Sequence, residues 1–394
     1  MRQLFSLSLA AALLTGCCAQ PEHKTTIVKA TLANPTKVII ETDLGNDIDD
    51  ALCLDLAFKG MDAGVLDLLA IGTHKKSPTA AKYADLLCDW YGYPETIVVE
   101  SRTPVVQSDY FDYTAPPVES GLYAIPRANR VTEDNSDEGV DKWRYPDPVT
   151  LYRKILSEAV PKSIAFVSVG FSTTLAQLLD SPADEISPKT GKELVAEKAK
   201  VLSIMAGSFG QYKRAEYNVK NDIPACQKLF AEWPGTIVMN PFEIGKMVMY
   251  PAKAISEGMS WAEHHPVADA YKAYKEFPYD RPSWDLLSIV YLSEPEMFTE
   301  VATGRITVDD EGYTHFTEDA KGNVVILDIN QTQAFTLYNY VVNETTKVPN
   351  KPKTLTMPDL FTRPQAVIIL VESLLLVGAQ STTAPTPGLL LHTG

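Results

Sequence analysis

Four carboxylates within eight residues are the strongest chemical signal in this sequence. They are Asp43, Asp47, Asp49 and Asp50. Like charges packed this closely are costly unless a cation neutralises them, and carboxylate oxygens suit a hard divalent cation. Asp is also favoured at the N-cap and in the first turn of a helix, which would account for one or two of the four. The run therefore predicts a metal or ligand site that capping alone does not explain.

The flanking segments place this acidic run at the end of a strand. Residues 37–41 are mostly apolar and typical of a buried parallel strand, and residues 51–58 are typical of a helix. Open α/β sheets bind their ligands at the carboxyl ends of their strands. The acidic run does not fit either of two other acidic motifs, the EF-hand loop and the phosphatase motif. An EF-hand loop counted from Asp43 needs Glu where Leu54 stands, and a phosphatase-type Asp-x-Asp needs an acid at Gly45.

Alternating strand and helix patterns continue to about residue 247. Further strands are predicted at 65–71, 96–100, 164–169, 201–204 and 236–239, and a helix is predicted at 79–91. Repeated βα units predict an α/β fold with a mostly parallel open sheet covered by helices on both faces. After about residue 291 we expect a small β-rich C-terminal appendage on the same domain. Its short antiparallel strands are predicted at 305–308, 312–316 and 324–327, before a helix near 332–342.

The acidic run resembles the fingerprint of the nucleoside hydrolase family, the inosine–uridine-preferring N-ribohydrolases, with two extra residues before the final acidic pair. Further segments resemble family motifs in the same order, and together they span about residues 37–291. These segments are 165–176, 202–207, 215–225 and 281–286. The match is to a divergent lipoprotein branch of the family, and it implies a nucleoside hydrolase-like fold.

The resemblance also implies an activity and a set of site residues. The activity is calcium-dependent hydrolysis of the N-glycosidic bond of ribonucleosides or related ribosides, releasing base and ribose. The implied Ca²⁺ ligands are the carboxylates of Asp43, Asp50 and Asp285 and the backbone carbonyl of Thr173. Asp43 would also act as the general base. The implied substrate-binding residues are Asp49, Ser77, Met205, Glu216, Asn218 and Trp284.

The residues alone leave the ribose-binding assignments open. Glu216 could be a surface acid, Asn218 a turn residue and Met205 ordinary core. Glu216 and Asn218 are two residues apart, so an extended segment would point both side chains the same way, as one face of a sugar requires.

Two positions depart from the family pattern. Trp284 stands where the family has a His linked to protonating the leaving base; Trp can stack on a base or a sugar but is no useful proton donor. His264 and His265 are expected at the surface rather than as a relocated acid. Where the family has an Asn after its second strand, Ser77 falls nearest. Lys75 and Lys76 are expected to be solvated, with a phosphate or carboxylate on the substrate as the alternative.

The N-terminus resembles a lipoprotein signal. Arg2 precedes an apolar stretch at 4–14 and the sequence Leu-Thr-Gly before Cys17. We therefore expect a signal peptide at 1–16, lipidation of Cys17, a tether at 17–36, a nucleoside hydrolase-like domain at 37–360 and a tail of no assigned function at 361–394. The protein would be extracytoplasmic, lipid-anchored to a bacterial membrane.

The net charge of −15 and the pI near 4.9 argue against nucleic acid as a partner. The expected partner is a small-molecule nucleoside or riboside, with membrane contact through the lipid anchor only. Family members are often homo-oligomers. Two other functions stay open: a non-catalytic riboside- or sugar-binding lipoprotein, for which Trp284 in place of His is the best argument, and a polysaccharide-directed hydrolase, suggested by the aromatic insertion at 101–147.

Overall fold

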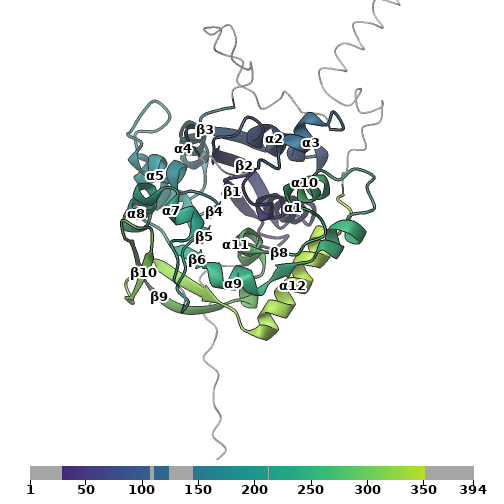
Figure 1. Cartoon of the computed structure of the whole chain (residues 1–394). Helices are drawn as coiled ribbons and strands as arrows, with labels where there is room; N and C mark the ends of the chain where they lie inside the picture. The colour runs from purple at the N-terminus through teal and green to yellow at the C-terminus, as the bar shows by residue number, and fades with distance from the viewer. Residues whose placement is uncertain (1–28, 107–110, 124–144, 212, 351–394) are drawn as a thin grey trace, which may run out of the picture.

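The computed structural model describes residues 29–106, 111–123, 145–211 and 213–350 (Figure 1). The predicted signal peptide, the lipidation site at Cys17 and the tail at 361–394 lie outside these residues. Among the described helices, none combines the length and the apolar character that a membrane span requires.

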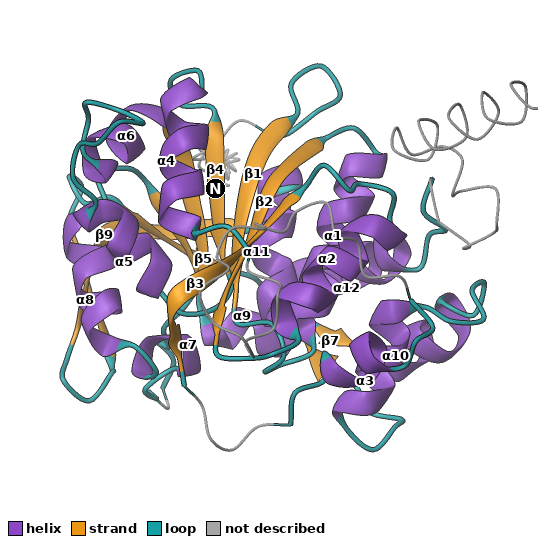
Figure 2. Ribbon diagram, turned by 90° about the horizontal axis from the view of Figure 1, so that it is seen from above, coloured by secondary structure: helices purple, strands orange, loops and turns teal. Residues whose placement is uncertain are grey.

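A nine-stranded sheet forms the centre of the molecule (Figure 2). Its order is β10-β9-β11-β6-β5-β4-β1-β2-β3, and the run from β11 to β3 is parallel, which confirms the predicted mostly parallel sheet. The strands are β1 (Thr36–Thr42), β2 (Leu66–Lys75), β3 (Ile97–Val105), β4 (Ile164–Ser168), β5 (Ala199–Met205), β6 (Ile237–Asn240), β9 (Thr299–Val308), β10 (Thr314–Glu318) and β11 (Val324–Asp328).

Helices cover both faces of this sheet, as the strand pattern predicts (Figure 2). The core on one face is completed by α1 (Asp49–Asp62), α2 (Ala80–Trp90), α10 (Pro266–Tyr274), α11 (Trp284–Ser293) and α12 (Gln331–Thr345). The core on the other face is completed by α4 (Pro148–Glu158), α5 (Thr173–Asp180), α6 (Gly191–Lys198) and α8 (Ile223–Glu232). The remaining elements are α3 (Ala115–Glu119), α7 (Tyr217–Lys220), α9 (Phe242–Met247), the π-helix Ala254–Gly258, the 3₁₀-helix Pro295–Met297 and the two-residue strands β7 (Met249–Tyr250) and β8 (Arg281–Pro282).

The predicted β-rich C-terminal part is present, and its strands extend one edge of the main sheet. β11 pairs in parallel with β6, and β9 lies antiparallel between β11 and β10. The side chains of β11 alternate between the two cores: Val325 and Leu327 join one, and Val324 and Ile326 join the other. Because both of its faces are apolar, β11 is stable only inside a sheet that is covered on both sides.

The direction of strand succession reverses between β1 and β4, which pair directly. From β1 the chain steps outward to β2 and β3, and from β4 it steps the other way to β5 and β6. Open α/β sheets bind ligands in the crevice at such a switch point, outside the carboxyl ends of the strands. The acidic run leaves β1 at this point.

Candidate active site

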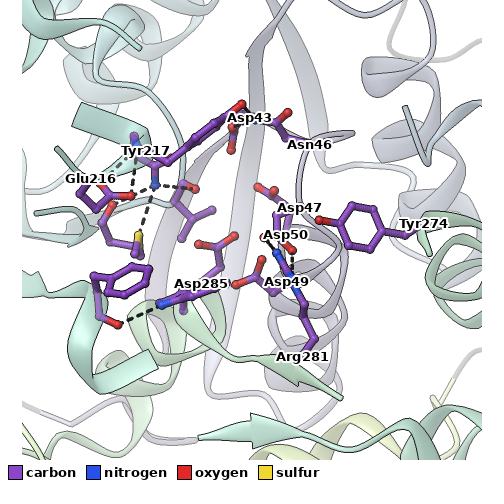
Figure 3. Close-up of a pocket in the computed structure, with 15 residues that line it drawn as sticks. Asp43, Asn46, Asp47, Asp49, Asp50, Glu216, Tyr217, Tyr274, Arg281 and Asp285 are labelled. Atoms are coloured by element: carbon purple, nitrogen blue, oxygen red, sulfur yellow. Dashed lines mark hydrogen bonds and ion pairs between the residues drawn. The ribbon is translucent and has the colours of Figure 1, made fainter. Parts of the chain in front are cut away.

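A cavity of about 210 Å³ opens at the carboxyl ends of β1, β4, β5 and β6 (Figure 3). Eight residues expected at the site line it: Asp43, Asp49, Asp50, Met205, Glu216, Asn218, Trp284 and Asp285. Seven further residues complete the lining: Asn46, Asp47, Val169, Tyr217, Phe242, Tyr274 and Arg281. Segments from the first and last thirds of the chain therefore meet around one small-molecule-sized space.

The first turn of α1 supplies two of the carboxylates that line the cavity, those of Asp49 and Asp50. Asp49 Oδ2 accepts a hydrogen bond of 3.1 Å from the backbone N–H of Asp285. Asp50 Oδ1 accepts one from the Thr42 hydroxyl, while Asp50 Oδ2 is buried without a hydrogen-bond partner. The N-cap of α1 is Ile48, which makes no side-chain cap. Neither acid makes a side-chain cap, although both lie in the first turn of α1, where Asp is favoured.

Burial and mutual repulsion together make the charged forms of these acids costly. Burial raises the pKa of Asp50 and Asp285 well above the ordinary value, and the neighbouring carboxylates raise both further. Burial also raises the pKa of Asp49 and, less strongly, of Asp43, where nearby His74 opposes it. A bound cation would lower the pKa of all four acids.

Asp43 is fixed by a hydrogen bond to its carboxylate and by close packing against its backbone. Asn46 Nδ2 donates to Asp43 Oδ2 at 2.6 Å. Behind the loop, His74 Nε2 accepts from the backbone N–H of Phe171 at 2.7 Å, and His74 Nδ1 lies 2.9 Å from Glu41 Oε2. A Cβ at Gly170 would collide with the His74 ring and the Asp43 backbone. This close packing fixes the position of Asp43 at the end of β1.

The donor set fits a hard divalent cation. As they stand, no three carboxylate, imidazole or thiolate side chains of the described residues are arranged to hold a metal ion. The cavity nevertheless contains two buried oxygens without hydrogen-bond partners, Asp50 Oδ2 and Asn46 Oδ1. Buried polar atoms nearly always have a partner, and clustered oxygen ligands are what Ca²⁺ and Mg²⁺ prefer.

Two expected site residues lie outside the lining of this cavity. Thr173 is the first residue of α5, so its carbonyl is placed for the helix's own hydrogen bonding, and its hydroxyl bonds to Asp222. Val169, at the end of β4, lines the cavity instead. Ser77 Oγ accepts from the backbone N–H of Ala80 at 2.9 Å and donates to Asp112. Ser77 thus fixes the start of α2.

Glu216 and Asn218 both reach the cavity, but not from the extended segment expected. Glu216 is the N-cap of α7 and Asn218 lies inside that helix. The Glu216 carboxylate accepts from the backbone N–H groups of Asn218 (3.1 Å) and Gly207 (3.3 Å). Asn218 Nδ2 donates to the Met205 carbonyl at 3.1 Å and lies 3.3 Å from the Val169 carbonyl. Burial raises the pKa of Glu216 to about 7.

One wall of the cavity is built from aromatic rings. Trp284 stacks on Phe242 with ring centroids 5.2 Å apart and planes 27° apart, and its Nε1 donates to the Phe242 carbonyl at 3.0 Å. The Arg281 guanidinium lies 5.3 Å from the ring centroids of both Trp284 and Tyr274. The indole N–H is therefore already used, and Trp284 presents a ring face rather than a proton donor.

Asp47 differs in role from its acidic neighbours. Arg281 Nε donates to Asp47 Oδ1 at 2.8 Å, and Arg281 Nη2 donates to Asp47 Oδ2, forming a bidentate pair (Figure 3). This pair ties the β1 loop to β8. Because Arg281 binds both oxygens of Asp47, the carboxylates of the acidic run that face the centre of the cavity are those of Asp43, Asp49 and Asp50.

Two expectations about polar residues near the motifs were wrong, those for His265 and Lys75. His265 is buried against Trp90 and Trp261 rather than exposed, and neither His264 nor His265 lines the cavity. Lys75 belongs to β2 and is buried, whereas Lys76 is exposed as expected. No histidine lines the cavity in the described part of the chain, so none replaces the missing family histidine there.

Six lining residues were not predicted from the sequence: Asn46, Val169, Tyr217, Phe242, Tyr274 and Arg281. Four of them stand inside segments already recognised, and Phe242 lies two residues after the end of β6. These positions carried a usable signal. Tyr274, at the end of α10, carried none, because nothing in its neighbourhood indicates that this helix reaches the site.

The doubly wound sheet and the oxygen-rich cavity at its switch point define an α/β enzyme that acts on a small molecule. The family model described as inosine-uridine preferring nucleoside hydrolase matches residues 38–344. The chain therefore belongs to this family, and it is a hydrolase of N-glycosyl bonds.

Individual relatives agree with this assignment. The chain is 25% identical over 297 residues to a protein of Oryza sativa subsp. japonica named probable uridine nucleosidase 2, covering 70% of this chain and 79% of that protein. Among solved structures it is similar to a plant nucleoside hydrolase, the PpNRh1 enzyme, with 20% identity, a TM-score of 0.59, and 80% and 100% of the two chains covered. An inosine-uridine preferring nucleoside hydrolase from Bacillus anthracis gives 16% identity and a TM-score of 0.57, with 79% and 100% covered.

Proposed function

We propose that this enzyme is a calcium-dependent nucleosidase that cleaves ribonucleosides or related ribosides into base and ribose. The observation that carries the proposal is the buried Asp50 Oδ2, which has no partner although it lies among Asp43, Asp49 and Asp285. A divalent cation would satisfy this oxygen and offset the repulsion among the four acids. Family membership supports the reaction class.

Asp43, Asp50 and Asp285 would hold the cation, with the Val169 carbonyl as the candidate fourth ligand in place of Thr173. When bound, a divalent cation supplies Lewis-acid chemistry that makes a water more acidic. Asp43 would accept the proton of the attacking water as general base, and Asn46 orients its carboxylate for that transfer. The overall reaction adds hydroxide to the sugar carbon and a proton to the departing base.

The other lining residues bind and orient the riboside. Asp49, Glu216 and Asn218 would hold the ribose hydroxyls, because polar side chains converge there in a buried space. Trp284 and Phe242 would stack on the base and exclude water from the bond that breaks. Met205 would close the pocket beneath the ribose; its carbonyl and Sδ both accept from Asn218 Nδ2.

The decisive experiment is release of base and ribose from uridine and inosine by the calcium-loaded enzyme. We expect turnover that stops on chelation, returns with Ca²⁺ and is lost in D50N. The matched control is D180N, which alters an exposed acid at the end of α5. Tight, saturable riboside binding without any product, measured by calorimetry, would replace this proposal with the non-catalytic binder.

For its location we propose a lipid-anchored, extracytoplasmic enzyme that serves nucleoside salvage. The support is the sequence alone: the basic and apolar start and the Leu-Thr-Gly-Cys17 segment. Metabolic labelling with palmitate in a bacterial host should mark the chain, and C17S should abolish the label and release the protein from the membrane fraction. An unlabelled wild-type chain would contradict the anchor.

A further inference from the structure

One cation stands among the acids of the cavity. Arg281 is the only Lys, Arg or His of the described residues that lines it, together with six carboxyl groups. The Arg281 side chain is 18% exposed, so the guanidinium is not sealed inside the protein. A substrate that enters the cavity therefore meets this positive charge.

The ion pair with Asp47 uses only part of the guanidinium (Figure 3). Nε and Nη2 donate to the two oxygens of Asp47. Nη1 makes no hydrogen bond to any residue whose position the structure describes. Because Asp47 and the rings of Tyr274 and Trp284 surround the group, its orientation is fixed. The two N–H donors of Nη1 remain available to a ligand.

Two departures from the family pattern meet at this group. Asp47 directly precedes Ile48 and the final acidic pair, where the acidic run is two residues longer than the family fingerprint. Trp284, which stands in place of the family histidine, lies with its ring centroid 5.3 Å from the Arg281 guanidinium. The longer run thus supplies the acid that holds a cation beside the position from which the histidine is missing.

We propose that Arg281 is a catalytic residue that stabilises the departing base by its charge, in place of an acid that donates a proton. This inference rests on the proposed hydrolysis at the same site. When the bond between C1′ of the ribose and the base nitrogen breaks, its electron pair stays on the base. In uracil this negative charge spreads to a carbonyl oxygen, which the N–H groups of Nη1 can bind.

The proton balance needs no acid among the lining residues. Arginine stays protonated in proteins, so Arg281 gives up no proton. The base leaves as an anion paired with the guanidinium and takes its proton from solvent. Without this cation, the anion would form among six carboxyl groups that repel it. A fixed charge in a site that excludes water stabilises such an anion far more than it would in water.

The test compares two ribosides that differ in how much help the leaving group needs. Uracil is a poor leaving group, whereas the nitrophenolate released from 4-nitrophenyl β-D-riboside is stable by itself. In the calcium-loaded enzyme, R281Q should lower kcat for uridine about 100-fold or more, and kcat for the nitrophenyl riboside less than about fivefold. R281K keeps the charge but not the planar fork, so its kcat for uridine should lie between those of R281Q and wild type.

The matched control is R305Q, which removes an exposed arginine of β9 that also pairs with an aspartate, Asp319. It should leave both rates unchanged. Hydrolysis of the nitrophenyl riboside by R281Q also shows that this variant is folded and binds its metal.

The outcomes separate this inference from the proposed function. Equal losses on both ribosides in R281Q would make Arg281 a purely structural partner of Asp47, and an unchanged rate on uridine would give it no role. Either result overturns the inference and leaves the nucleosidase intact. A selective loss in Y274F but not in R281Q would assign the role to the Tyr274 hydroxyl and overturn it too. If wild type cleaves neither riboside, the proposed hydrolysis itself fails, and this inference fails with it.

Discussion

The backbone N–H of Asp285 donates to Asp49 Oδ2 at 3.1 Å, which joins the first turn of α11 to the first turn of α1 across 236 positions of sequence. This single bond places the last acid of the site against the acidic run that follows β1. Both groups are buried, so the bond is shielded from water and fixes the distance between two walls of the cavity.

Substitution of Asp49 tests this bond. D49A leaves the Asp285 N–H without its acceptor in a buried place, whereas D49N keeps a carbonyl oxygen there. A buried donor left unpaired costs about 1–3 kcal/mol, so D49A should be less stable than D49N by that amount in urea unfolding with chelator present. Equal stability of the two variants would show that the bond does not hold the helices together. Both should lose most activity, since both remove the carboxylate.

The Asp47–Arg281 pair is expected to position the loop rather than to bind the metal. Both side chains are mostly buried, and a double-mutant cycle with D47N and R281M should give a coupling of about 1–2 kcal/mol in unfolding free energy. Calcium affinity should change less in D47N than in D50N. A loss of calcium binding in D47N as large as that in D50N would make Asp47 a ligand and contradict the assignment.

Trp284 should act through its ring. W284F keeps an aromatic ring to stack on Phe242 and loses the N–H donor and part of the ring area, whereas W284A removes the whole ring system. We expect W284A to raise KM for the riboside about tenfold and to lower stability by about 2–4 kcal/mol, with W284F close to wild type in both. F335A, at an exposed ring on α12, is the control for a lost aromatic. A W284F enzyme as impaired as W284A would point to the indole N–H instead.

Glu216 predicts a particular dependence of stability on pH. Its pKa is about 7 in the folded protein because of burial, against the ordinary 4.5. As pH rises between these values, the unfolded chain loses the proton first, so the folded state is progressively disfavoured, by about 3 kcal/mol across the window. With chelator present, E216Q should lose less stability than wild type from pH 4.5 to 7, and exposed-site E185Q should match wild type. If the unfolding free energy of E216Q and of wild type changed with pH at the same rate, the raised pKa of the buried Glu216 carboxyl would be refuted.

Much of the fold could be predicted because its strands are short apolar runs separated by helical patterns. Each predicted strand from 37–41 to 236–239 overlaps an observed strand. The C-terminal strands were recognised, but their partner was not, because pairing of β11 with β6 joins segments far apart in the sequence. Periodicity reports which faces of a strand are apolar, and not which strand it pairs with.

The site was predictable wherever chemistry is concentrated in a motif, as at Asp43–Asp50. It was not predictable where a shift of a few residues along the chain changes the role of a side chain. Thr173 lies four residues beyond Val169, and the start of α5 between them moves Thr173 out of the cavity lining. Ser77 was displaced for a similar reason, since β2 continues to Lys75 and leaves Ser77 to fix the next helix.

The central claim is that a divalent cation joins the loop after β1 to Asp285. A crystal structure of the chain with Ca²⁺ and ribose tests it most directly. We predict one calcium ion with carboxylate oxygens of Asp43, Asp50 and Asp285 at about 2.3–2.6 Å, and the ribose hydroxyls on the same ion. A calcium-saturated crystal in which these three carboxylates bind no ion would contradict the account.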